Sequence, residues 1–246
     1  MKEDIILLKK EFKKIKNQGL IKSLRNGPTG VGYTFETLLN KKEDQECKPD
    51  FGSIELKCKL GYSKSSLTLF NCVPIRNNNS ALKYIFENYS NFRYGNKNSY
   101  KLFERKVFSK YSIKRFNKEF KLKIDYYGAE VIMEAYDNGE YVENVCSWSF
   151  RTLERKLKKK LNTMAIIQAY PYEINSEIYY KYMKLDLYKL IGFFEFLKLI
   201  ENDKIYVQFY LKNGISSNGN ALIDDHGVAF KIKQIYIEEL FYKLKK

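Results

Sequence analysis

Residues 49–57 read PDFGSIELK, and an alternation of polar and apolar residues runs from Ser53 to Leu60. A period of two is typical of a strand with one buried face, so we predict a strand over residues 52–60. Asp50 precedes this strand, and Gly52 between them can bend the chain back. The stretch therefore predicts a turn that brings a carboxylate to the beginning of a strand.

Glu55 and Lys57 lie two positions apart, so in a strand their side chains leave the same face. With Asp50 they can converge on one point, where two carboxylates supply the oxygen ligands that Mg²⁺ prefers. A bound metal ion lowers the pKa of its water and neutralises charge on a phosphate, and a lysine can hold the attacking water or steady the phosphorus. The alternative is a half-exposed strand with ordinary charges on its solvent face.

The chain has 246 residues and a formal net charge of +15, spread along the sequence rather than confined to a tail. This length permits one large domain or two small ones. The charge favours a polyanionic partner such as nucleic acid, although a lysine-rich surface from a biased genome would give the same excess.

No apolar run reaches the roughly 18 residues of a membrane span, and residues 3–18 have the spacing of an amphipathic helix rather than a signal peptide. We expect a cytoplasmic protein.

The cysteines and the histidine argue against two common kinds of site. The four cysteines form no Cys-x-x-Cys pair and His226 is the only histidine, so a structural zinc site lacks clustered ligands. Mechanisms that depend on histidine acid-base chemistry are weakened for the same reason, whereas a carboxylate site with a metal ion requires no histidine.

Helical and strand patterns interleave along the chain, which predicts a mixed α/β fold. Residues 65–75 form a second apolar strand, and the GYSK segment before them suits a hairpin that would place the two strands side by side. We expect helices over residues 185–202 and 237–246. Residues 213–226 are predicted to form a long polar hairpin loop.

A glycine-rich loop and a short helix precede the opening stretch. The loop LRNGPTGVGY (24–33) contains three glycines and a proline, and YTFETLLN (33–40) has the apolar spacing of a helix that carries Glu36. A helix carboxylate that points into the same pocket would add a third acidic group to Asp50 and Glu55.

The order of glycine-rich loop, Glu36 helix, Asp50 turn and Glu-Leu-Lys strand resembles the PD-(D/E)xK nucleases. Within that superfamily it is similar to the MutH-like nucleases, and GPTGVGYTFETLLN with PDFGSIELKCK resembles the MvaI/BcnI restriction endonuclease family. The strong part of the resemblance covers residues 24–75. Asn40 stands where that family's helix often ends in glycine, and asparagine also tolerates the left-handed C-cap conformation.

The resemblance implies roles for the residues of these motifs. Asp50 and Glu55 would be ligands of Mg²⁺, with the Leu56 carbonyl as a third ligand, and Lys57 would be the catalytic lysine. Glu36 would be an additional acidic residue near the pocket. The implied activity is Mg²⁺-dependent hydrolysis of phosphodiester bonds in double-stranded DNA by a type II restriction endonuclease.

The resemblance also implies how such an enzyme acts. It would be a monomer that cuts one strand at a time at a short C/G-rich near-palindrome of the CC(A/T)GG type, with a cognate DNA methyltransferase in the same host. A centre of G or C is the alternative within the family, and no residue separates the two. Two other functions stay open, namely a MutH-like repair nuclease that nicks DNA and a basic DNA-binding protein without catalysis.

The expected architecture is restriction-endonuclease-like. A mixed β-sheet core would be flanked by helices, and two lobes would form a cleft for DNA. We place a catalytic lobe at residues 1–145 and a DNA-recognition lobe at residues 146–246, with an approximate boundary.

Residues that read DNA are expected mainly in the stretch 211–233, which is rich in amide and acidic side chains. Asp224 and Asp225 would accept hydrogen bonds from cytosine amino groups or are solvated turn residues, and His226 would donate to guanine or cap the turn. The basic helix at residues 149–161 lines a phosphate path or is a solvated helix face. The predicted DNA contacts are Arg25, Lys59, Lys212, Asn213, Asp224, Asp225, His226 and Lys231, with Asn218 and Asn220 in the same stretch.

Overall fold

The computed structural model describes residues 1–40, 48–94, 99–110, 113, 117–215 and 221–245. The chain forms two compact units, each assembled from segments that are separate in the sequence. Unit 1 comprises Met1–Ser65, Lys156–Ile191 and Ile237–Lys246, and unit 2 comprises Ser66–Arg155 and Gly192–Tyr236. The predicted lobe boundary at 145/146 falls inside a strand of unit 2, β10 (Glu140–Ser149). The assignment of catalysis and DNA recognition to separate lobes stays a prediction.

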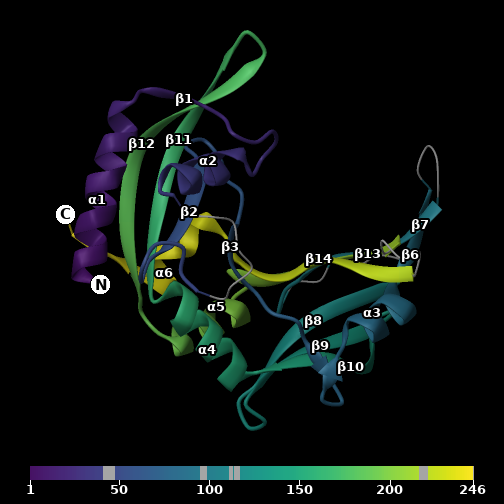
Figure 1. Cartoon of the computed structure of the whole chain (residues 1–246). Helices are drawn as coiled ribbons and strands as arrows, with labels where there is room; N and C mark the ends of the chain where they lie inside the picture. The colour runs from purple at the N-terminus through teal and green to yellow at the C-terminus, as the bar shows by residue number, and fades with distance from the viewer. Residues whose placement is uncertain (41–47, 95–98, 111–112, 114–116, 216–220, 246) are drawn as a thin grey trace. The chain divides into compact units, whose positions relative to one another are not determined.

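Unit 1 is built on a five-stranded sheet with the order β1-β12-β11-β2 (Figure 1), and β15 also pairs with β12. Its strands are β1 (Leu20–Lys22), β2 (Glu55–Leu60), β11 (Thr163–Ile174), β12 (Glu177–Leu190) and β15 (Phe241–Lys243). β2 runs parallel to β11, and the other pairs in this sheet are antiparallel. The predicted mixed sheet flanked by helices is therefore confirmed.

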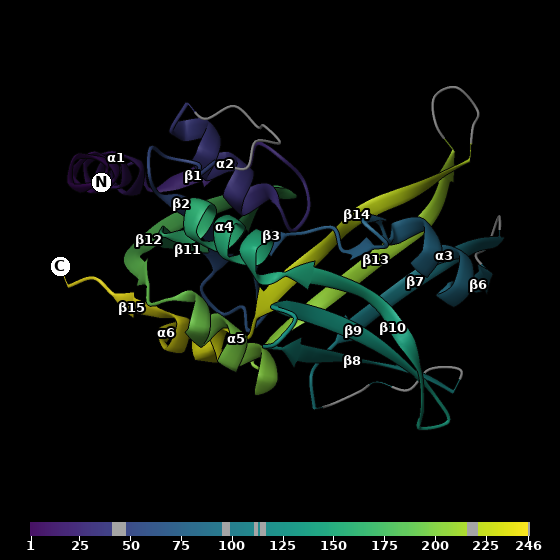
Figure 2. The same ribbon diagram turned by 90° about the horizontal axis from the view of Figure 1, so that it is seen from below.

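Two helices cover one face of this sheet. α1 (Lys2–Asn17) runs beside β12, and Figure 2 looks nearly along its axis, while α2 (Gly30–Leu38) packs on β2. Apolar side chains of both helices share a buried cluster with Leu56 and Ile167 of the sheet. Because neighbouring positions of a strand face opposite sides, this leaves Glu55 and Lys57 on the other face.

The neighbours of β2 differ from those that the sequence predicts. β2 pairs with β11, with Glu55 opposite Met164 and Lys57 opposite Ile166. The strand that follows it, β3 (Leu67–Asn71), pairs instead with β14 in another sheet, so the predicted hairpin between them is wrong. Both strands are apolar enough to pair with several partners, and the GYSK segment does not fix which partner is used.

Unit 2 contains two further five-stranded sheets, ordered β5-β4-β10-β9-β8 and β3-β14-β13-β7-β6. The strands not yet given are β4 (Ile75–Arg76), β5 (Asn79–Ser80), β6 (Asn91–Tyr94), β7 (Ser99–Val107), β8 (Lys118–Asp125), β9 (Glu130–Asp137), β13 (Ile205–Ile215) and β14 (Ala221–Ile232). The remaining helical segments are α3 (Leu82–Tyr89), α4 (Phe150–Leu161), α5 (Phe193–Glu201), a 3₁₀ turn at Gln234–Tyr236 and α6 (Ile237–Leu240). In the described part of the chain, no helix has the length and apolarity to cross a membrane.

Three predicted elements are corrected. The helix expected at 185–202 is strand β12 up to Leu190 and helix α5 only from Phe193. The helix expected at 237–246 stops at Leu240, and β15 then joins the sheet of unit 1. The loop expected at 213–226 is largely strand, because β13 continues to Ile215 and β14 begins at Ala221. The first two depend on pairing within the sheet of unit 1, whereas in the third the β13/β14 hairpin pairs with itself as far as Ile215 and Ala221.

Candidate active site

A tight turn delivers the chain from Asp50 to β2. Phe51 and Ile54 exchange two backbone hydrogen bonds, of 2.9 Å and 2.8 Å, around Gly52 and Ser53. Gly52 has a φ of +56°, which a side chain would strain, so the predicted bend at this glycine is confirmed. A Cβ at Gly52 would also lie 2.7 Å from the Asp4 carboxyl group of α1.

The turn places the Asp50 carboxylate against the beginning of the strand. Asp50 Oδ2 accepts a hydrogen bond of 3.0 Å from the backbone N–H of Leu56. This bond fixes the carboxylate beside the residue whose carbonyl is the predicted third ligand. Asp50 and Glu55 are thereby held at the same end of β2.

Glu55 is the centre of the charged groups on this face. Its side chain is 1% exposed, and its Oε1 lies 2.7 Å from Lys57 Nζ and 3.4 Å from Lys160 Nζ. Its Oε2 is buried and has no hydrogen-bond partner within the described residues. A buried carboxylate oxygen without a donor is costly unless a ligand satisfies it.

Burial and neighbouring charges act on Glu55 in opposite directions. Burial raises the pKa of Glu55, the Lys57 ammonium lowers it, and the Asp50 carboxylate raises it again, so that the pKa lies above the ordinary value. Two carboxylates that repel each other at a buried point are typical of a site that gains stability from a cation.

Glu36 lies on the side of β2 that α2 covers. A Cβ at Gly32 would be 3.7 Å from Glu36 Oε1 and 3.9 Å from Cys58 Cβ, which places the carboxylate near that thiol. Burial raises the pKa of Cys58 well above its ordinary value, and Glu36 and Asp50 raise it further. Both carboxylates therefore act on the same thiol. Convergence of Glu36 with Glu55 in one pocket stays a prediction.

The glycine-rich loop is fastened to the sheet before α2 begins. A Cβ at Gly30 would lie 2.3 Å from the Arg25 carbonyl oxygen and 2.8 Å from the Tyr180 hydroxyl, so only glycine fits there. The Arg25 guanidinium stacks 3.8 Å from the centroid of the Tyr33 ring. After α2, Asn40 has a φ of +58°, as its tolerance of the left-handed conformation predicts.

Four of the predicted DNA contacts have side chains that the structure describes on strands. Lys59 is partly buried, and its pKa is lowered by burial and raised by Asp186. Lys231 is also partly buried, and burial and the Lys106 ammonium lower its pKa. Lys212 lies 4.4 Å from the centroid of the Tyr100 ring, and Asn213 Oδ1 accepts a 2.6 Å hydrogen bond from the Lys101 N–H. Their contacts with DNA stay predictions.

The acidic pair and the histidine lie in a strand rather than a turn. Asp225 is the ladder partner of Leu211 and Asp224 is that of Lys212, and His226 stands at a bulge beside Gly227. The interpretation of these three residues as turn residues is therefore wrong. Asn218 and Asn220 lie outside the described residues.

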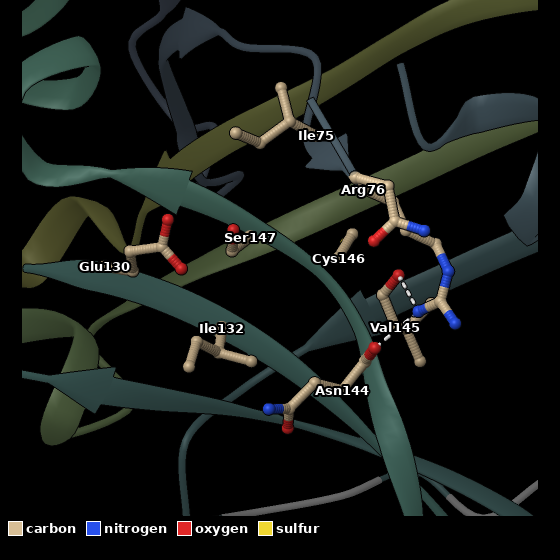
Figure 3. A pocket seen from close by; sticks show the side chains of 9 residues that line it. Ile75, Arg76, Glu130, Ile132, Asn144, Val145, Cys146 and Ser147 are labelled. Carbon is tan, nitrogen blue, oxygen red and sulfur yellow. Dashed lines mark hydrogen bonds between the residues drawn. The ribbon is translucent and has the colours of Figure 1, made fainter. Parts of the chain in front are cut away.

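Unit 2 contains a hollow of about 170 Å³ between β4, β9 and β10 (Figure 3). Arg76 lies at its rim, and its guanidinium donates to the Asn144 and Val145 carbonyls at 2.6 Å and 3.0 Å and to Glu143 Oε2 at 2.8 Å. Glu130 is the only carboxylate among the lining residues. The hollow thus lacks the paired carboxylates that mark the end of β2.

The donor set at β2 fits a divalent cation with oxygen ligands. Two carboxylates and a backbone carbonyl are hard ligands, and the buried Oε2 of Glu55 is the atom that such an ion would satisfy. Within the described ranges, no three side chains of His, Cys, Asp or Glu gather as metal ligands. A site here would therefore combine few side-chain ligands with a carbonyl and waters, as Mg²⁺ sites do.

Two residues outside the predicted site residues contact Glu55 and the turn before it. Lys160 belongs to the basic helix for which the sequence predicts a phosphate path or a solvated face, and Asp4 belongs to α1. The apolar Leu153 and Leu157 of α4 are a usable signal, because Lys160 follows them by seven and three residues and so lies beside the buried face of the helix. No local pattern marks Asp4.

A family model and two solved structures agree on one family for this chain. The sequence model of the MvaI/BcnI restriction endonuclease family matches residues 9–241. The structure of restriction endonuclease MvaI in complex with its cognate DNA substrate is similar to this chain, with a TM-score of 0.86, 29% identity, and coverage of 99% of this chain and 98% of that chain. MvaI in the absence of DNA has a TM-score of 0.63 at the same identity and coverage. No curated protein matches the sequence.

An identity of 29% makes this chain a relative of MvaI and a separate protein. The motifs between residues 24 and 75, taken alone, indicate a closer similarity to MvaI than the 29% identity of the whole chain. Positions that read DNA cannot therefore be carried over by likeness of the active-site motifs.

Proposed function

The chain belongs to the MvaI/BcnI restriction endonuclease family, and on that premise we propose that Asp50, Glu55 and Lys57 are its catalytic centre for Mg²⁺-dependent DNA hydrolysis. Membership makes it a type II restriction endonuclease, a deoxyribonuclease that cleaves at a specific sequence. The observation that carries the proposal is the gathering of Asp50 and Lys57 around the buried Glu55 at the beginning of β2.

Each of the three residues has a distinct task in this proposal. Asp50 and Glu55 hold the divalent cation with the Leu56 carbonyl. When bound, the cation supplies neutralisation of the negative charge that builds on the phosphate during hydrolysis. The Lys57 side chain is 19% exposed and its ammonium is bonded to Glu55. It orients the attacking water and steadies the charge at the phosphorus.

Glu36 is an accessory acidic residue in the proposal. Its carboxylate lies near Cys58, which follows Glu55 by three residues in β2. A negative charge beside the strand favours a cation in the site without being a direct ligand.

We assign recognition of the DNA sequence to the sheet that contains β13 and β14. Arg25, Lys59 and Lys231 are proposed to contact DNA phosphates. Acidic residues are poor phosphate contacts, but they accept hydrogen bonds from the cytosine amino group in the major groove. Asp224 and Asp225 are proposed to read cytosine in this way and His226 to read guanine, with Lys212 and Asn213 beside them. The proposed site is a C/G-rich near-palindrome of the CC(A/T)GG type.

The experiment is a digest of an unmethylated plasmid with the purified protein and Mg²⁺, followed by sequencing of the fragment ends. We expect discrete fragments whose ends map to CC(A/T)GG-type sites, and no product with excess chelator. An early accumulation of open circles before linear DNA would support cutting of one strand at a time by a monomer. Protection by methylation of the same sequence would support a cognate methyltransferase in the host cytoplasm.

Other outcomes have definite meanings. Ends that map to a different sequence would overturn the proposed site and leave the nuclease in place. Nicking without discrete fragments would favour a MutH-like repair function. A DNA complex unaffected by chelator, with no product at any Mg²⁺ concentration, would indicate a DNA-binding protein without catalysis.

A further inference from the structure

Two lysines from different parts of the chain share a single oxygen of Glu55. Lys57 Nζ lies 2.7 Å and Lys160 Nζ 3.4 Å from Oε1, and neither contact involves Oε2. Lys57 belongs to the same strand as Glu55, whereas Lys160 comes from the last turn of α4. The carboxylate is thus held from two directions at one of its oxygens.

This arrangement determines which oxygen is left for a ligand. A carboxylate held by one cation can rotate about its terminal bond, because such torsions have broad minima. Two ammonium groups at Oε1 restrict this rotation, so Oε2 stays on the opposite side. Oε2 is also the oxygen that is buried and has no donor in the described part of the chain.

Lys160 is placed for this contact by its helix. Its side chain is 29% exposed, between the buried leucines of α4 and the exposed neighbouring Lys159. The last turn of a helix carries unpaired carbonyls that attract a cation, which helps to hold the ammonium there. A position at the edge of the buried face lets the side chain reach Glu55, whereas Lys159 lies on the exposed side.

We propose that Lys160 is a positioning residue, which together with Lys57 holds Oε1 of Glu55 so that Oε2 is presented to the divalent cation. The inference rests on the proposed function, because it takes Glu55 as a ligand of that cation. It adds a residue outside the Asp50–Lys57 motif to the machinery of the site. Residues that orient a metal ligand typically contribute about 10- to 100-fold to metal affinity or activity.

The test measures binding of Mn²⁺, as a probe for the cation, to the full-length protein by electron paramagnetic resonance without DNA. Lys160→Met removes the ammonium and keeps a chain of similar length, and Lys160→Arg keeps a cation. Lys159→Met is the matched control, since it removes the same charge from the same helix turn. Glu55→Gln identifies the Mn²⁺ that is bound at this site, and thermal unfolding checks that every variant is folded.

We expect Lys160→Met to weaken the Glu55-dependent Mn²⁺ binding by about 10-fold or more, with Lys159→Met unchanged and Lys160→Arg close to wild type. If Lys160 acted only as a nearby positive charge, its removal would tighten Mn²⁺ binding, and that result or an unchanged affinity would overturn the inference. An equal loss in Lys159→Met would do the same. Wild-type protein without Glu55-dependent Mn²⁺ binding would remove both this inference and the proposed metal site, whereas wild-type binding with an unaffected Lys160→Met removes the inference alone.

Discussion

Asp4 in the first turn of α1 holds Ser53 in the turn that precedes β2. Its Oδ2 accepts hydrogen bonds from the Ser53 hydroxyl at 2.6 Å and from the Ser53 backbone N–H at 3.2 Å. The Ser53 hydrogen bonds lower the pKa of Asp4, so the carboxylate is ionised at neutral pH. The helix thus fixes the turn that sets the distance between Asp50 and Glu55.

Replacing Asp4 with alanine should slow DNA cleavage by about 10- to 100-fold, because small displacements of catalytic groups have effects of this size. DNA binding should change little, since Asp4 contacts the turn and carries no positive charge. Single-turnover cleavage and a binding assay with chelator measure the two quantities. Glu3→Ala, an exposed carboxylate in the same helix turn, is the matched control. Equal rates for the two variants would contradict the role of Asp4.

Removal of either catalytic side chain should abolish cleavage. Asp50→Ala and Lys57→Ala are each expected to reduce the cleavage rate by at least about 100-fold at saturating Mg²⁺. Affinity for DNA should remain largely intact in both variants. Lys64→Ala, an exposed lysine after the same strand, controls for the lost charge. Substantial cleavage by Asp50→Ala would exclude Asp50 from the site.

Two glycines of α2 should respond oppositely to alanine. Gly30→Ala forces a Cβ into the Arg25 carbonyl at 2.3 Å, and we expect a loss of about 1–3 kcal/mol in the free energy of unfolding. In Gly32→Ala the new Cβ has no atom closer than 3.7 Å. The better helix propensity of alanine should therefore add about 0.5–1 kcal/mol to the free energy of unfolding. Chemical denaturation of both variants compares them directly. A neutral Gly30→Ala would contradict the packing of the loop against the sheet.

Acid should destabilise unit 2 through Glu143. Burial raises the pKa of this carboxyl, but hydrogen bonds from the Tyr84 and Tyr89 hydroxyls and the Arg76 guanidinium outweigh burial and bring it below its ordinary value. A lowered folded-state pKa contributes stability that is complete above the unfolded pKa of about 4.3 and is lost as the pH falls through the folded value.

Glu143→Gln should therefore be less stable than wild type at pH 7, and the difference should shrink as the pH falls below about 4. Thermal unfolding at a series of pH values measures this. Glu140→Gln, an exposed residue of the same strand, should follow the wild-type curve. A difference in stability that stays constant down to pH 3 would show that the charge of Glu143 is not the cause.

The alternation at 53–60 and the glycine at 52 were sufficient to predict β2, its turn and the approach of Asp50 to Glu55. These features depend on residues within a few positions of each other, where a period of two and a positive φ at glycine limit the geometry. Asn40 with its left-handed conformation belongs to the same class of local prediction.

The sequence by itself determined this local frame, and with it the family and the kind of chemistry. Only the tertiary structure decided that β11 rather than β3 lies beside β2, that residues 185–190 form a strand, and that Lys160 and Asp4 contact the site. The reason is physical: an apolar strand can pair with many partners, and an ammonium or carboxylate far away in the chain reaches Glu55 or Ser53 only after the helices have packed on the sheet.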